Sequence, residues 1–474
     1  MLNHGINTVK SETNILDTAE TLVGIPFFVG AWPCHTKGGF VGKPQLVRNL
    51  SEAKALGGYS EDWRDASGNP KWTLCEAAYS QFAIFGQSPA IFYNVFDPAT
   101  HKSAVSPASK SVTDHAIVIS DEAIIDSGLT VKSGDDALVK DTDYTVAYDG
   151  NDVVIVLKSG STYYTATALT VGYNKVDLSG ITASAIETAI GKIETCKALL
   201  GIVPDLIACP GWSQTPVVAA VMAAKAASIN GMYKGKAVVD LDTSVSGADT
   251  YDDIATYKSA NGYTDENMIV CWPLAKNGGK VFNFSTVVCG LIAQTDRNNS
   301  GVPSRSISNL EIPVDGCVVK AGTEIALTVE QADVVSYTDG VVTAFNFNGW
   351  RAWGNYTGAG RTANTAKAFI CTNRMHDFIC NSFIDRFWVY LDRPLTRVLI
   401  DAIVNEFNAY LTALTASGDL YGGEISYVEA NNSDADLLAG KFRLDTVLAS
   451  PVPAQQIDMV AEFDVGMIVD ALNV

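Results

Sequence analysis

The feature that most constrains the fold is a regular alternation of side chains near the C-terminus. From Ile457 to Val469 every odd-numbered position is apolar, whereas Asp458, Glu462 and Asp464 stand at even positions. Successive side chains of a β-strand point to opposite faces, so this pattern predicts a strand with one apolar face. Burying its seven apolar side chains is worth about 10–20 kcal/mol, and ordering the segment costs a similar amount. The strand therefore has to dock on a sheet.

Two sheets could accept this strand. The first is intramolecular, because Lys441 to Leu448 also has the pattern of a strand and a hairpin between the two is the simplest connection. The second is a sheet of a neighbouring subunit, so that the strand links two copies of the chain. The residues alone leave both possibilities open.

Most of the preceding chain alternates short apolar runs with helical periodicity, which is typical of a parallel α/β sheet. Thr73 with Glu76, and Thr328 with Gln331, have the spacing of capping boxes at helix starts. Strands are predicted at 22–30, 89–96, 204–210, 236–241 and 268–273, and helices at 51–56, 73–85, 182–200, 215–230, 252–259, 285–294 and 395–414.

One internal segment differs from the rest. Between about Ser103 and Asp177 the chain is dense in Val, Thr, Tyr, Asp and Gly, and an Asp149-Gly150 turn joins two short alternating runs. These features predict an inserted β-sandwich. The expected fold class is multidomain α/β (α+β), with an N-terminal extended arm (1–21), an α/β core (22–102 and 178–348), the insert (103–177), a C-terminal α/β domain (349–454) and a terminal strand (455–474).

The overall charge narrows the possible partners. The formal net charge of the 474 residues is −19, which disfavours a nucleic-acid partner because phosphate recognition needs a basic surface.

The first twenty residues lack the pattern of a secretory signal. No apolar run approaches the roughly 18 residues that span a bilayer. We expect cytoplasmic synthesis and no membrane insertion.

No segment predicts a catalytic or cofactor site. Phosphate-binding loops, dinucleotide fingerprints, metalloprotease helices and nucleophile elbows are missing from the sequence. The turn Ala208–Thr215, the strand-end pair Asp240 and Asp242, and the neighbours His376 and Asp377 are better explained as structural groups. The nine cysteines are scattered singly, without metal-binding spacing. We expect no enzymatic activity, no cofactor and no metal.

Several segments follow one another in a characteristic order. They are HGINTV (His4–Val9), TLVGIPFFVGAWP (Thr21–Pro33), PDLIACPGW before an Ala-rich helix and KAVVDL, STVVCGLIAQTDRNNSGVPSRSISN (Ser285–Asn309), GWRAWGNYT (Gly349–Thr357) and FICTNRMHDFICNSF (Phe369–Phe383). In this order they resemble the sheath proteins of contractile phage tails and related phage-tail-like particles, particularly the P2-like branch. The resemblance covers most of the chain outside the insert.

The resemblance implies a structural subunit that polymerises as helical rings around an inner tube and contracts to drive that tube through a bacterial cell envelope. The implied partners are further copies of the chain, the inner tail tube protein, and baseplate and tail terminator proteins. The implied location is a virion tail or phage-tail-like particle, assembled in the bacterial cytoplasm and released. A phage, a bacteriocin and an injection system fit equally.

The resemblance also assigns roles to particular residues. Strand exchange between subunits would involve His4, Ile6, Thr8, Ile457, Met459, Ala461, Phe463, Val465 and Met467. The possible tube-facing residues are Arg374, Arg386, Arg393 and Arg397. Because Asp377, Asp385 and Asp392 lie among them, structural salt bridges within the domain are the favoured role of these arginines. The β insert would project outward. Two other classes remain as alternatives: a soluble α/β enzyme with a β accessory domain, and an adhesive surface protein.

Overall fold

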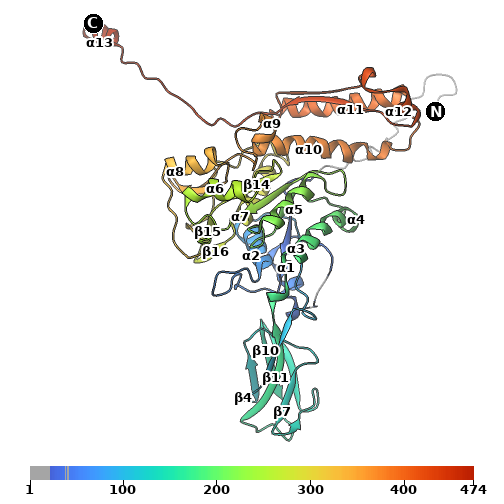
Figure 1. The fold of residues 1–474 in the computed structure, drawn as a ribbon, viewed down its shortest axis with the longest axis vertical. Helices are drawn as coiled ribbons and strands as arrows, with labels where there is room; N and C mark the ends of the chain where they lie inside the picture. Colours follow the sequence, from blue (N-terminus) through green and yellow to red (C-terminus); the bar gives the residue numbers. More distant parts are fainter. Residues whose placement is uncertain (1–21, 38, 40–41, 474) are drawn as a thin grey trace, which may run out of the picture.

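The computed structural model describes residues 22–37, 39 and 42–473 of the chain. Figure 1 shows an α/β core in the middle, a β insert at one end, and a helical C-terminal unit at the other end from which a long tail departs. Helices and several separate sheets occur together. The predicted fold class, multidomain α/β, is confirmed.

The core is built on a six-stranded sheet in the order β14-β13-β12-β1-β3-β2. Five of its strands run parallel, and the edge strand β2 (Gln45–Val47) is antiparallel to β3. Every residue of the parallel strands is buried, as expected where helices cover both faces of a sheet. These strands are β1 (Pro26–Gly30), β3 (Ala90–Asn94), β12 (Leu206–Ala208), β13 (Lys236–Asp240) and β14 (Met268–Cys271).

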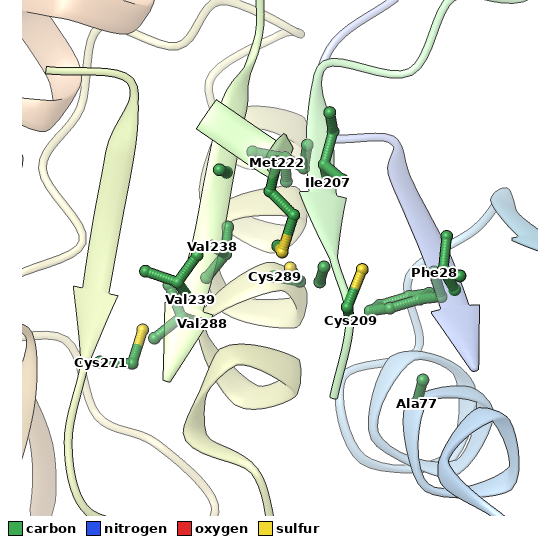
Figure 2. Close-up of a cluster of buried hydrophobic side chains, with 14 of the residues drawn as sticks. Phe28, Ala77, Ile207, Cys209, Met222, Val238, Val239, Cys271, Val288 and Cys289 are labelled. Atoms are coloured by element: carbon green, nitrogen blue, oxygen red, sulfur yellow. The ribbon is translucent and has the colours of Figure 1, made fainter. Parts of the chain in front are cut away.

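Two groups of helices pack on this sheet. Helices α3 (Ala183–Ile190) and α5 (Pro216–Ala227) contact each other and β1, β12 and β13. Helix α7 (Phe284–Asn298) contacts β12, β13 and β14. Figure 2 shows Met222 of α5 and Cys289 of α7 both reaching the sheet. The described residues contain nine free cysteines. Eight of them, Cys289 included, are buried, and Cys380 is exposed.

One predicted capping box is confirmed and the other is wrong. Thr328 and Gln331 cap α8 (Val329–Asp333) reciprocally. Helix α2 (Thr73–Ala78) instead has Trp72 at its N-cap without a side-chain cap. Glu76 is fully buried, and its carboxylate accepts hydrogen bonds from the backbone and side chain of Asn283, at the start of α7. A distant tertiary partner has replaced the local one.

The insert forms two sheets with a core of its own. The first has the order β5-β10-β9 and the second the order β4-β11-β7-β8, with β6 paired to β11. Four of these strands are short: β5 (Ala116–Ile119), β6 (Ala123–Ile124), β7 (Thr130–Ser133) and β8 (Asp136–Ala137). The predicted Asp149-Gly150 turn joins β9 (Tyr144–Asp149) to β10 (Asp152–Leu157). Lys102 at the start of β4 (Lys102–Ser111) pairs with Val176 at the end of β11 (Ala168–Val176). The two connections to the core therefore lie side by side (Figure 1).

The C-terminal unit pairs two long helices with a two-stranded sheet. Helices α10 (Ile370–Phe387) and α11 (Arg397–Ala416) share a hydrophobic cluster with strands β20 (Gly422–Ser426) and β21 (Asp445–Ala449). The hairpin of β18 (Thr343–Asn346) and β19 (Trp350–Trp353) belongs instead to the core cluster, which includes Ala352. Judged by these packing contacts, the C-terminal unit begins after residue 349, the start that was predicted from the sequence.

Smaller elements complete the described fold. They are α1 (Leu50–Gly57), α4 (Cys196–Leu200), α6 (Ile254–Ala260), β15 (Leu274–Asn277), β16 (Lys280–Phe282), β17 (Gly316–Val318), α9 (Thr365–Ala368) and α12 (Asp434–Leu438).

The structure corrects the prediction for the C-terminal tail. Residues 450–464 have no regular structure, and helix α13 (Val465–Leu472) follows them. The predicted strand Ile457–Val469 is not formed, and β21 pairs with β20 rather than with the tail. A strand needs a partner for its backbone groups, whereas a helix satisfies them internally. Of the two alternatives that the residues left open, the intramolecular hairpin is therefore not formed in this single chain.

Candidate assembly site

An apolar groove opens on the C-terminal unit. Its volume is about 830 Å³, and it lies between α10 and the segment that leads into β21. Three of its lining residues are polar or weakly polar: His376, Cys380 and Thr446. The apolar residues that line it are Ile379, Phe383, Ile384, Leu391, Phe407, Ile425, Phe442, Leu444, Val447 and Leu448. Such a lining suits a row of apolar side chains better than a polar small molecule.

The sheet beside this groove has one free edge, that of β21, whereas on β20 the Asn408 side chain bonds to the N–H and C=O of Ile425. Strands β20 and β21 are antiparallel: Gly422 lies opposite Ala449 at one end and Ser426 lies opposite Asp445 at the other. Within the described part of the chain, neither strand pairs with a third strand. A two-stranded sheet alone is only marginally stable. Its unpaired backbone groups form a template for another strand. Groove and edge together make an acceptor for a strand with one apolar face.

The tail has the complementary character. The exposed fractions of Ile457, Met459 and Phe463 are 89%, 88% and 78%, and Ala461, Val465 and Met467 are exposed as well. The tail leaves the body at Gln455, whose side chain accepts a hydrogen bond from the Tyr356 hydroxyl and donates one to Asn355. The exchange residues predicted in the tail are therefore all accessible. His4, Ile6 and Thr8 lie outside the described residues.

Arg374 does not have the exposure that a tube contact requires. Its side chain is 5% exposed and binds the carboxylates of Asp296 and Asp205 at 2.6 and 2.9 Å. Burial raises the pKa of Asp296, and the Arg374 charge opposes that rise. Of the two roles considered for Arg374, the structure therefore shows the salt bridge within the molecule, and the burial of this guanidinium speaks against a contact to the tube.

The same face of α10 is fixed to the core over several turns. The Lys236 ammonium lies 2.5 Å from Asp377, and Lys197 lies 3.0 Å from Asp385. Between them the Asn381 side chain donates to the Lys234 carbonyl and accepts from the Lys234 N–H. Burial lowers the pKa of Lys236, and Asp377 opposes this change. Polar contacts thus join the core to a helix whose apolar face packs in the C-terminal cluster.

The neighbours His376 and Asp377 make different contacts. Asp377 forms an ion pair with Lys236 of the core, whereas His376 lines the groove. Burial lowers the pKa of His376, and the Asp377 charge opposes this change. Both residues also line a second cavity of about 300 Å³.

The other predicted arginines lie near the turn between α10 and α11. Arg386 stacks over Tyr410 at 4.0 Å and Arg393 over Tyr390 at 4.7 Å. The Arg397 side chain is 69% exposed and pairs with Asp401 at 2.9 Å. Exposed apolar residues accompany them, namely Trp388, Val389, Leu391 and Val398. We call this surface, residues 386–398, the helix tip.

The remaining polar candidates serve the fold. Asp240 is buried at the end of β13 and accepts hydrogen bonds from the Ser285 N–H at 2.7 Å and the Ser285 hydroxyl at 2.5 Å. Burial raises its pKa to about 6. Asp242 accepts from Ser244 in its own loop. Among the residues that the structure describes, no cluster of His, Cys, Asp or Glu could hold a metal ion, and no helix has the length and apolarity to cross a membrane.

Comparison with known proteins gives one consistent result. No family model matches the chain. It is 23% identical to the tail sheath protein of Burkholderia phage BcepMu over 97% of this chain and 96% of that protein. It is 22% identical to the tail sheath protein of Escherichia phage P2 over 56% of this chain and 64% of that protein.

The fold agrees with these relatives. The contracted helical sheath of the anti-feeding prophage superposes with a TM-score of 0.58 and 14% identity, over 98% of this chain and all of that one. The chain thus has the fold of a contractile sheath subunit. The resemblance to contractile tail sheath proteins that the sequence segments indicated is confirmed.

Proposed function

We propose that this chain is the structural sheath subunit of a contractile tail, which polymerises as helical rings around an inner tube and contracts to drive the tube through a bacterial cell envelope. The observation that carries the proposal is the match to a phage tail sheath protein along nearly the whole of both chains. The agreement in fold with a contracted helical sheath supports it. The corresponding particle is a virion tail or a phage-tail-like device.

The tail and the groove supply the links between subunits in this proposal. The odd-numbered side chains of Ile457–Val469 enter the groove of a neighbouring copy, and the tail backbone pairs with the free edge of its β20–β21 sheet. Donor and acceptor are different surfaces of one chain. A head-to-tail contact of this kind gives a closed ring when its rotation closes and an open helix when it does not, and the proposed sheath uses the open form. The predicted N-terminal residues His4, Ile6 and Thr8 are the second proposed linker.

The helix tip is the proposed contact to the inner tube. It combines Arg386, Arg393 and Arg397 with exposed apolar side chains. Cationic and apolar groups together suit a partner surface that carries carboxylates beside apolar patches. Arg374 is excluded from this contact by its burial. Baseplate and tail terminator proteins are proposed to bind the two ends of the sheath, which is assembled in the bacterial cytoplasm.

The subunit is proposed to work by conformational change, without bond chemistry. Three of its buried charged groups have structural partners: Asp240 and Glu76 bind the first residues of α7, and Arg374 binds two carboxylates. The relatives are themselves named as sheath proteins. These observations support a non-enzymatic role.

A truncation tests the proposed linkage. Removing Gln456–Val474 deletes only residues that the described structure leaves exposed, so the subunit should keep its unfolding midpoint and lose from its circular dichroism spectrum only the small helical signal of α13. Ordered tubes should be lost in negative-stain micrographs. Normal tubes formed by the truncated chain would refute the exchange of this strand.

The matched control removes charge rather than length. Asp458 and Glu462 lie on the polar face of the same segment, and replacing both with asparagine and glutamine should leave tube formation intact. A loss equal to that of the truncation would mean that the segment acts through its charge.

A further inference from the structure

The C-terminal tail contains two overlapping apolar patterns. As a strand, its odd positions form one apolar face that ends with Val465, Met467 and Val469. In helix α13, Val465, Ile468, Val469 and Leu472 have the i, i+3, i+4, i+7 spacing of one helical face. Met467 therefore belongs only to the strand face, and Ile468 only to the helical face. The two patterns cannot be used at the same time.

Helix α13 is weakly held. All eight of its residues are exposed. Its cap is the Asp464 carboxylate, which accepts from the Gly466 N–H at 2.7 Å. Isolated helices of this length are marginal in water, and valine, isoleucine and glycine are poor helix formers. Because valine and isoleucine favour strands, the helix should yield to a sheet edge that becomes available.

While it exists, the helix keeps the backbone groups of the tail in internal hydrogen bonds. Strand addition needs those same N–H and C=O groups. The β20–β21 sheet offers a free edge beside an apolar groove that accepts one row of side chains. A strand meets both requirements, whereas an intact helix meets only the apolar one.

We propose that α13 is the form of this segment in the free subunit, and that docking on the β20–β21 sheet of a second copy converts residues 465–472 from helix to strand. The inference rests on the proposed function. The helix then slows strand addition between free subunits, alongside the repulsion caused by a net charge of −19. Assembly starts when one tail opens on an acceptor that is already in place.

Two neighbouring substitutions test the conversion. Met467→Lys places a charge on the strand face and outside the helical face, whereas Ile468→Lys does the reverse. In full-length subunits, tube formation followed by light scattering and micrographs should be lost for Met467→Lys and retained for Ile468→Lys. The opposite result would mean that the segment docks as a helix. Equal effects, including no effect in either variant, would also overturn the conversion.

A second pair of variants changes the strength of the helix without touching the apolar strand face. Asp470→Ala should lengthen the lag before tube formation about threefold, because alanine favours a helix over aspartate by about 0.7 kcal/mol. Asp464→Ala removes the cap and should shorten the lag. Asp458→Ala is the control, since it removes the same charge outside α13 and should leave the lag unchanged. A lag unchanged by both helix variants would contradict the gating role.

The outcomes separate this inference from the proposed function. If the chain without Gln456–Val474 forms normal tubes, strand exchange itself fails. If that truncation blocks assembly while Met467→Lys and Ile468→Lys behave alike, exchange stands and the helix-to-strand conversion fails.

Discussion

Arg374 and Asp296 form a two-pronged ion pair inside the joint between helix α10 and the α/β core. The two guanidinium nitrogens lie 2.9 and 2.6 Å from the two carboxylate oxygens, and the side chains are 5% and 2% exposed. Asp205 adds a second carboxylate on the same arginine. Because both side chains are buried, water cannot solvate either charge when its partner is removed.

Removing one partner of this pair should be costly. Arg374→Met leaves Asp296 and Asp205 without their cation, and we expect the free energy of unfolding to fall by about 3–5 kcal/mol. Urea denaturation of the subunit measures this change. Arg397→Met breaks the exposed pair with Asp401 and should cost less than about 1 kcal/mol. Similar losses in the two variants would contradict a structural role specific to Arg374.

The buried carboxyl group of Glu76 should make the stability of the subunit depend on pH. Burial raises its pKa to about 7, above the value of about 4.3 expected in an unfolded chain. Between those pH values the folded state binds more protons than the unfolded state, so this group makes stability fall as pH rises. Glu76→Gln should flatten that fall between pH 5 and 8 in urea titrations. The exposed Glu330→Gln should leave the slope unchanged, and an unchanged slope in Glu76→Gln would disprove the assignment.

The adjacent ends of the β insert predict that it can be removed. Lys102 pairs with Val176, so replacing 103–175 with a short glycine linker should leave the core folded and tubes able to form. The melting temperature should drop by a few degrees, because the contacts of Trp72 with Glu122 and of His35 with Tyr148 are lost. Wholesale unfolding of the deleted chain would show that the insert is part of the core.

The helix tip predicts a separation between two kinds of assembly. Arg393→Glu combined with Arg397→Glu should weaken co-sedimentation of the sheath with inner tubes and leave tube-free sleeves intact, because neither residue lies in the groove. Arg48→Glu, on an exposed side chain of the core, is the control. Unchanged binding in the double variant would contradict a tube contact at the tip.

The strands of the core could be predicted because each one is marked by the residues of its own short segment. The strands around Phe28, Ile207 and Val238 are short apolar runs bounded by turns, and burial on both faces produces that pattern. The insert was equally visible in its alternating residues and in its Asp149-Gly150 turn.

Other residues depend on partners far away in the sequence. Arg374 stands 78 residues from Asp296 and 169 from Asp205, and Glu76 stands 207 from Asn283. No spacing rule connects such pairs, so the sequence could not name the partner of either side chain. A salt bridge was favoured for Arg374 without its partners, and Glu76 was assigned to a local cap. The groove was missed for the same reason, because Ile379 and Leu448 meet only after folding.

The strand predicted for the C-terminal tail is missing from the described structure for a different physical reason. Its period of two predicts a strand, and in the proposed assembly that strand pairs with the β20–β21 sheet of a second copy. The described structure is that of a single chain, and it shows an exposed segment and a short helix.

Electron microscopy of the purified full-length chain tests the central claim most directly. Concentrated subunits, with and without inner tubes, should form hollow helical sleeves, which the chain lacking Gln456–Val474 cannot form. Monodisperse monomers of the full-length chain at every concentration and salt condition, with or without tubes, would contradict its assignment as a contractile sheath subunit.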